Sequence, residues 1–138
     1  MPKLHSILET ALYVDDLDRA AAFYDSIMGL PVLYADSRMR AYNVSGRSVL
    51  LLFVRGATTE PVHTPGGVIP PHDGSGQLHM AFAVAQQELE PWRAHLAAHD
   101  VTIEGTSGWK NGGHSLYFRD PDGNLLELAT TPGVWDGF

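Results

Sequence analysis

Two stretches of the chain alternate between apolar and polar residues and then change to the spacing of an amphipathic helix. The first covers residues 9–14 followed by 17–28, and the second covers 78–84 followed by 87–99. Each stretch therefore predicts a β-strand that leads into an α-helix.

Three shorter apolar segments follow each predicted helix and are typical of strands joined by tight turns. They cover 32–35, 39–44 and 49–54 in the first half, and 101–104, 114–118 and 125–128 in the second. The same order of predicted elements thus occurs twice along the chain. We predict an α+β fold in which two β-α-β-β-β modules, at about 7–54 and 78–130, form a mixed sheet within a single domain of 138 residues.

Residues 55–77 interrupt the repeat and are rich in Gly, Pro, Thr and His. A long stretch without strand or helix periodicity is uncommon inside a domain and is often functional. We predict a connecting loop that covers the binding cleft as a lid or as an arm onto a partner chain. His63 and His72 lie in this loop, where they either line a pocket or are solvated.

Three polar side chains stand at equivalent places on the framework strands: Glu9, His79 and Glu127. Side chains two apart on a strand share a face, so small residues such as Ala81 surround these groups and leave room for a ligand. Two carboxylates on a partly buried face need a cation. The three residues therefore indicate a metal site, and the alternative is that Glu127 pairs with an arginine at a solvated edge.

Composition narrows the possible partners. The formal net charge of −7 argues against nucleic acid and anionic membranes, which both attract basic surfaces. The absence of cysteine excludes disulfides, thiolate catalysis and Cys-ligated zinc. No run of apolar residues suggests a secretion signal or a membrane span, so we expect a cytoplasmic protein.

Several longer motifs resemble the vicinal oxygen chelate superfamily, the group of glyoxalases, bleomycin-resistance proteins and extradiol dioxygenases. The matching segments are Leu12-Tyr-Val-Asp-Asp-Leu17, Ala22-Phe-Tyr24, Gly29-Leu30, His79-Met-Ala-Phe-Ala-Val84 and Tyr117-Phe-Arg-Asp-Pro-Asp-Gly-Asn-Leu-Leu-Glu-Leu128. The resemblance implies that paired modules form a cupped, glyoxalase-like sheet around a divalent metal. By position its ligands are Glu9, His79 and Glu127. It also implies a homodimer, in which Glu9 of one chain can face His79 and Glu127 of the other.

Two positions depart from the family pattern. Glu9 stands where the family commonly has histidine, and the position of a fourth ligand, near Leu52, is apolar. These changes alter the charge of the site and limit it to three protein ligands. Two carboxylates and one imidazole balance a dication, which favours lyase, isomerase or thiol-transfer chemistry over ring-cleaving dioxygenase chemistry.

The function that we predict is that of a divalent-metal-dependent enzyme of glyoxalase type, acting on a small molecule with adjacent oxygens. The metal is Mn, Fe, Ni or Zn, and Glu9 or Glu127 acts as the catalytic base. The alternative is a metal-free protein of bleomycin-resistance type that binds a drug or another small molecule in the same cleft. The third possibility is a ring-cleaving dioxygenase.

Further side chains are candidates for contact with the substrate or for a separate site. The predicted substrate-binding residues are Tyr13, His63, His72, Trp109, His114 and Tyr117. His95 and His99 lie four residues apart on the second predicted helix. This spacing either binds a metal or belongs to a solvated helix face.

Overall fold

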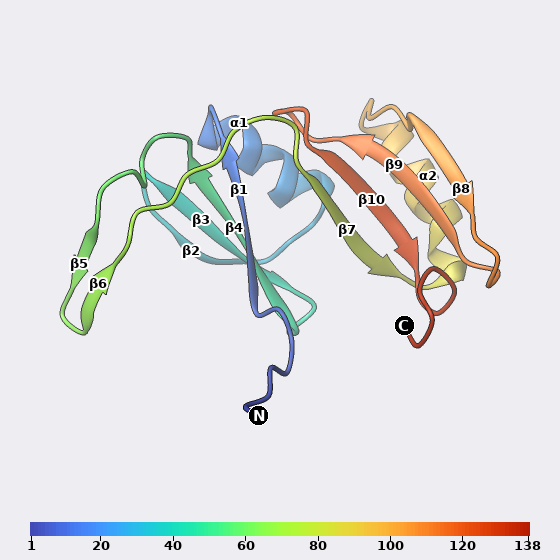
Figure 1. The fold of residues 1–138 in the computed structure, drawn as a ribbon. Coiled ribbons are helices and arrows are strands. Elements are labelled where there is room, and N and C mark those ends of the chain that lie inside the picture. The colour runs from blue at the N-terminus through green and yellow to red at the C-terminus, as the bar shows by residue number, and fades with distance from the viewer. The chain divides into compact units, whose positions relative to one another are not determined.

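The computed structural model describes all residues, Met1–Phe138, and divides them into two compact units, Met1–Ser75 and Gly76–Phe138. Each unit holds one four-stranded mixed sheet with a helix (Figure 1). The α+β class and the two β-α-β-β-β modules are as predicted. That the two modules form a single domain stays a prediction.

Unit 1 contains the first module and a hairpin that extends away from its sheet (Figure 1). Its elements are β1 (Glu9–Val14), α1 (Leu17–Ala22), the π-helical turn η1 (Phe23–Ile27), β2 (Val32–Ala35), β3 (Met39–Val44), β4 (Ser48–Val54), β5 (Val62–Thr64) and β6 (Gly67–Ile69). The sheet order is β1-β4-β3-β2, with β1 parallel to β4 and the other pairs antiparallel. Strands β5 and β6 pair only with each other.

Unit 2 repeats this arrangement. Its elements are β7 (His79–Val84), the 3₁₀ turn η2 (Gln86–Glu88), α2 (Leu89–Ala98), β8 (Gly105–Gly108), β9 (His114–Arg119) and β10 (Leu125–Thr130). The sheet order is β7-β10-β9-β8, with β7 parallel to β10 and the other pairs antiparallel. In each unit, therefore, the first strand pairs in parallel with the last strand of its module.

The first helix is capped at both ends by residues suited to that role. The carboxylate of Asp16 accepts a hydrogen bond from the backbone N–H of Arg19 at 3.0 Å, and Gly29 takes a φ of 65° just past the last turn. The helix is α-helical only to Ala22 and then widens into η1. The wider turn lets the adjacent rings of Phe23 and Tyr24 both be buried.

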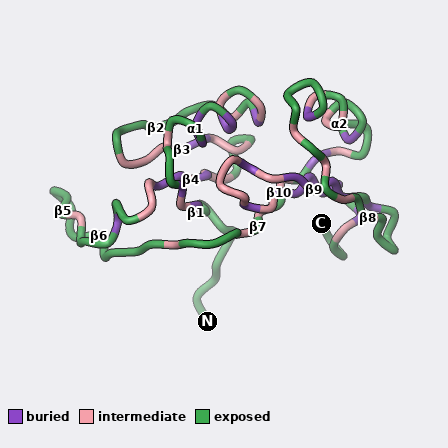
Figure 2. The backbone as a smooth tube through the Cα atoms, turned by 90° about the horizontal axis from the view of Figure 1, so that it is seen from above, coloured by how far each residue is buried: buried purple, intermediate pink, exposed green.

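The two faces of each sheet differ as the alternation predicts. In unit 1, Leu12 and Leu52 are buried, and in unit 2 Leu126 and Leu128 are buried in the same way. Figure 2 shows buried segments along strands of both sheets. On the other face Glu9, His79 and Ala81 are exposed. We call this second face of each sheet its open face.

Two details of the predicted elements are wrong. The strand expected at 101–104 is absent, and β8 follows at Gly105–Gly108, beginning where the N–H of Glu104 bonds to the carbonyl of Tyr117 at 2.8 Å. Pairing with β9 outweighs the poor strand propensity of Gly-Thr-Ser-Gly. The loop at 55–77 is not without structure, because it contains β5 and β6 around the turn Pro65-Gly66. None of the helices combines the length and apolar character needed to cross a bilayer.

Candidate metal centre

His79 and Glu127 meet on the open face of unit 2. His79 opens β7 opposite Leu125, and Glu127 lies two residues further along the neighbouring strand β10. The imidazole Nε2 of His79 is 3.2 Å from Oε2 of Glu127. The side chain of His79 is 51% exposed, whereas that of Glu127 is only 10% exposed. A carboxylate so largely removed from water needs a positive partner.

The hydrogen bonds of His79 determine which ring nitrogen can bind a cation. Its Nδ1 lies 2.9 Å from the carbonyl oxygen of Leu125, and a carbonyl only accepts hydrogen bonds, so Nδ1 carries a proton. Nε2 then either bears a second proton or points a lone pair at the carboxylate of Glu127. Two acceptors facing each other are stabilised by a cation between them. A metal-bound histidine commonly donates its other N–H to a carbonyl in this way.

The turn before β10 holds this pair in register. Asn124 is 1% exposed, and its side-chain oxygen accepts the N–H of Leu78 at 2.9 Å, next to His79. Its side-chain nitrogen donates to the buried carboxylate of Asp120 at 2.9 Å. No signal in the sequence points to this role, because Asn124 and Leu78 lie 46 residues apart along the chain.

Glu9 occupies the place in unit 1 that His79 occupies in unit 2. It opens β1 opposite Val49 of β4, and its side chain is exposed. The same registers make Leu51 the counterpart of Glu127, since Leu51 pairs with Ala11 as Glu127 pairs with Ala81. The fourth-ligand position is thus Leu51 and not Leu52, which points into the core and is fully buried. Both residues are apolar, so Glu9, His79 and Glu127 remain as the candidate ligands.

Neither unit alone gathers three or more His, Asp or Glu side chains into a group that could hold a metal ion. The pair in unit 2 therefore offers two candidate ligands. Convergence of Glu9 with His79 and Glu127, within one chain or between two, stays a prediction.

The open face of unit 1 carries a cluster of rings. The hydroxyl of Tyr13 lies 2.7 Å from Nδ1 of His72, and the His72 ring packs edge-on against Phe53 with centroids 4.8 Å apart. Burial, and to a lesser degree the charge of Asp73, raises the pKa of Tyr13. The phenol thus keeps its proton and remains a hydrogen-bond donor over a wide range of pH.

His72 belongs to a segment, residues 72–74, that is fixed across this face. The backbone N–H of His72 donates to the carbonyl of Thr58 at 2.9 Å, and the buried Thr58 hydroxyl donates to the carbonyl of His72. Asp73 accepts the N–H of Gly56 at 3.2 Å. Gly74 lies so close to Tyr13 that a Cβ there would be 2.7 Å from Cε2 of the ring. The end of the long loop is therefore a structured cover over part of the open face.

The other predicted substrate-binding residues are dispersed. Tyr117 pairs with Glu127 across β9 and β10 and so shares its face. Trp109 lies on that face as well, where its indole N–H donates to Ser115 at 2.9 Å. His114 lies on the opposite face, where its Nδ1 is 3.2 Å from the side-chain oxygen of Gln86. His63 is exposed in the hairpin strand β5.

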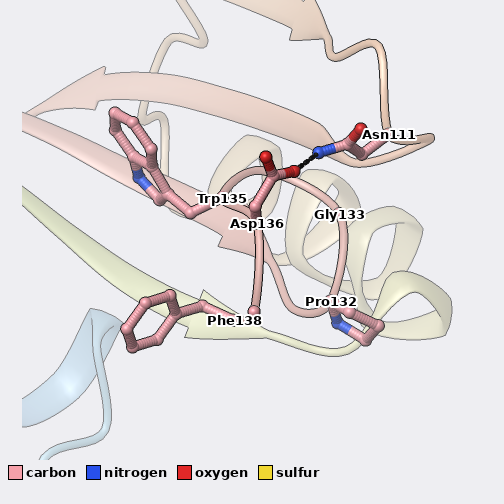
Figure 3. A pocket seen from close by; sticks show the side chains of 7 residues that line it. Asn111, Pro132, Gly133, Trp135, Asp136 and Phe138 are labelled. Carbon is pink, nitrogen blue, oxygen red and sulfur yellow. Dashed lines mark hydrogen bonds between the residues drawn. The ribbon is translucent and has the colours of Figure 1, made fainter.

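Two pockets in unit 2 lie away from the His79–Glu127 pair. One, of about 310 Å³, is formed by the C-terminal segment and includes Trp135 and Phe138. Asn111 donates a hydrogen bond to Asp136 at its edge (Figure 3). The other, of about 300 Å³, lies between α2 and the edge of the sheet and includes His114. Neither pocket contains His79 or Glu127.

Comparisons of the sequence with known proteins all point to the same superfamily. Residues 6–128 match the family model described as the glyoxalase/bleomycin resistance protein/dioxygenase superfamily. A protein named glutathione transferase FosA from Serratia marcescens is 34% identical over 128 residues, covering 91% of this chain and 80% of that protein. Metallothiol transferase FosB from Staphylococcus saprophyticus is 30% identical, covering 92% and 78%.

A solved structure gives the same result. Lactoylglutathione lyase from Agrobacterium tumefaciens superposes with a TM-score of 0.85 at 33% identity, covering 94% of this chain and 96% of that one. The match covers both sheets of this chain. The names of these three relatives each refer to a thiol compound or its transfer: glutathione, a metallothiol and lactoylglutathione. The chain therefore belongs to the glyoxalase/bleomycin resistance protein/dioxygenase superfamily, known also as the vicinal oxygen chelate superfamily.

Proposed function

We propose that this chain is a divalent-metal-dependent enzyme that transfers a thiol to a small electrophile, or rearranges or cleaves a thiol conjugate, where the reacting molecule offers two neighbouring oxygens. The observation that carries the proposal is the His79–Glu127 pair, with Nδ1 committed to the Leu125 carbonyl and Nε2 facing a largely buried carboxylate. The names of the relatives support a thiol substrate, because two of them contain glutathione and one contains metallothiol.

The burial and contacts of the three candidate ligands suggest a separate role for each. His79 and Glu127 would hold the metal from unit 2, and Glu9 would be the third ligand, from the same chain or from a partner chain in a homodimer. Open positions on such a dication would bind the two oxygens and stabilise negative charge on them. Glu9 is exposed, whereas Glu127 is held against His79, so Glu9 is the better placed of the two carboxylates to accept a proton. Mn, Fe, Ni and Zn are the candidate ions.

The substrate would occupy the open faces. Ala81 and Ala83 are exposed beside Glu127 and leave space for a small molecule. Trp109 and Tyr117 lie on the same face of unit 2, and Tyr13 with His72 would provide polar contacts from unit 1. We propose that residues 72–74 cover bound substrate and limit the access of water.

Metal analysis and turnover test the proposal together. The protein would be purified without added metal and analysed for bound elements. It would be assayed for thiol transfer with glutathione and small electrophiles that carry adjacent oxygens, and separately for rearrangement of the hemithioacetal that glutathione forms with a 2-oxoaldehyde. We expect activity that chelation removes and that Mn²⁺, Ni²⁺ or Zn²⁺ restores. Glu9→Gln and Glu127→Gln should abolish it.

Glu104→Gln is the matched control, because Glu104 makes an ion pair with Arg119 at 3.0 Å in which both side chains are well exposed. This variant should retain full activity. Tight binding of a small molecule by metal-free protein, with no turnover under any metal, would support the binding-protein alternative and overturn the proposal.

A further inference from the structure

A second histidine pair lies on α2, away from the sheet that carries His79. His95 is in the last turn of the helix and His99 is its C-cap residue, so the two are one helical turn apart. His95 is half-buried and His99 is exposed. The ring centroids are 4.4 Å apart with an angle of 46° between the planes.

We propose that His95 and His99 form a second metal site, which binds Cu²⁺, Ni²⁺ or Zn²⁺ through two imidazoles. Two histidines at this spacing project from one side of a helix and can chelate one ion, with water completing its coordination. The site does not depend on the function proposed above, because it shares no residue with Glu9, His79 and Glu127.

The hydrogen bond of His99 prepares it for this role. Its Nδ1 lies 2.8 Å from the carbonyl oxygen of His95, which only accepts, so Nδ1 carries a proton and Nε2 is the nitrogen left for a metal. This is the arrangement of His79, where Nδ1 bonds to the Leu125 carbonyl. In both cases a backbone carbonyl fixes the orientation of the ring and the tautomer that a metal requires.

The chemistry of the ligands predicts which ions bind. A site built from imidazole alone suits Cu²⁺, Ni²⁺ and Zn²⁺, whereas Mg²⁺ and Mn²⁺ prefer oxygen ligands. The candidate centre on the sheet offers two carboxylates and one imidazole and therefore accepts Mn²⁺. The two candidate sites should therefore differ in their affinity for Mn²⁺, which only the site on the sheet is expected to bind well.

Trp92 provides an optical signal for this site. Its ring packs edge-on against His95 with centroids 5.4 Å apart. A paramagnetic Cu²⁺ ion on the pair would therefore lie beside one indole and quench its fluorescence. Trp109 and Trp135 also fluoresce, so Trp92→Phe separates their contribution.

The experiment is a titration of the intact chain with Cu²⁺ and with Ni²⁺, in which binding is measured by calorimetry and by tryptophan fluorescence. We compare the wild type with His95→Gln, His99→Gln, Trp92→Phe and Glu127→Gln. The histidine variants should each bind Cu²⁺ about 100-fold more weakly at one site, because loss of one imidazole removes the chelate. They should lose the fluorescence change and keep the wild-type circular dichroism.

The two control variants make the result specific. Glu127→Gln should retain the fluorescence change, and Trp92→Phe should lose it while still binding the ion. Equal Cu²⁺ affinity in the wild type and both histidine variants, at equal stoichiometry, would overturn the proposal. Binding of Mn²⁺ is measured in parallel, so failure of the site on the sheet remains distinguishable from failure of this one.

Discussion

The substitution Glu127→Gln tests the candidate metal centre most directly. It keeps the size of a side chain that is only 10% exposed and removes its negative charge. The new amide can donate to Nε2 of His79, because Nδ1 of that ring already donates to Leu125. Stability without metal should therefore change by no more than about 1 kcal/mol, the net value of one hydrogen bond.

With metal present the effect should be large. An ion at 100 times its dissociation constant stabilises the folded chain by about 2.7 kcal/mol, and a 100-fold loss of affinity reduces this to about 0.4 kcal/mol. For 138 residues, average unfolding entropies convert each kcal/mol into about 3 °C. The metal-induced rise in melting temperature should thus fall from about 8 °C to about 1 °C in the variant.

Calorimetric melting with and without Mn²⁺ measures this difference, and Mn²⁺ is chosen because it discriminates against the histidine pair on α2. Glu104→Gln makes the same chemical change at an exposed ion pair in the same unit and should behave as the wild type. If Glu127→Gln and the wild type gain equal stability from Mn²⁺, Ni²⁺ and Zn²⁺, Glu127 is not a ligand and the reasoning is refuted.

Three further predictions concern the stability of the two units. Burial, and then the hydrogen bond to Asp25, raises the pKa of Tyr42 well above its usual value. The unfolded chain loses this proton near pH 10 while the folded chain keeps it, so the unfolding free energy should fall as pH rises above about 10. Tyr42→Phe should flatten that decline in urea titrations, and an identical slope in both proteins would contradict the assignment. Gly74→Ala should cost about 1–3 kcal/mol, since the added methyl group meets the ring of Tyr13, and unchanged urea midpoints would show that the loop simply moves aside. Asn124→Ala removes the acceptor for the part-buried N–H of Leu78 and the donor to the buried Asp120 carboxylate. It should cost about 1–3 kcal/mol in thermal unfolding, with wild-type stability as the opposing result.

The alternation of apolar residues was sufficient to predict the faces of the strands, because each sheet buries one face beneath its helix. Leu12 and Leu126 are buried and Glu9 and His79 are exposed, as their positions in the strands predict. The strand β8 was placed too early because its sequence has little intrinsic preference, and pairing with β9 determines its position.

The contacts that orient the side chains of the candidate site could be predicted only in part from the sequence. The approach of His79 to Glu127 could be predicted from the repeat, whereas the carbonyl that orients His79 could not, since any residue at 125 offers one. The segment 72–74 crosses the open face because of Thr58 and Asp73, whose partners lie 14 and 17 residues away. The dipeptide Pro65-Gly66, with Val62 before it and Val68-Ile69 after it, was the signal for the missed hairpin.

The turn that ends in Asn124 has a consequence for protein engineering. It joins the start of β7 to the start of β10 through one buried amide, while the N–H of Leu125 returns a bond of 2.8 Å to the carbonyl of Leu78. These two bonds lie next to His79 and close to Glu127, so they determine the spacing between the histidine and the carboxylate at the start of both strands. A designer who transplants this ligand pair onto another parallel strand pair should move the turn with it and can leave the remaining strand residues to the host.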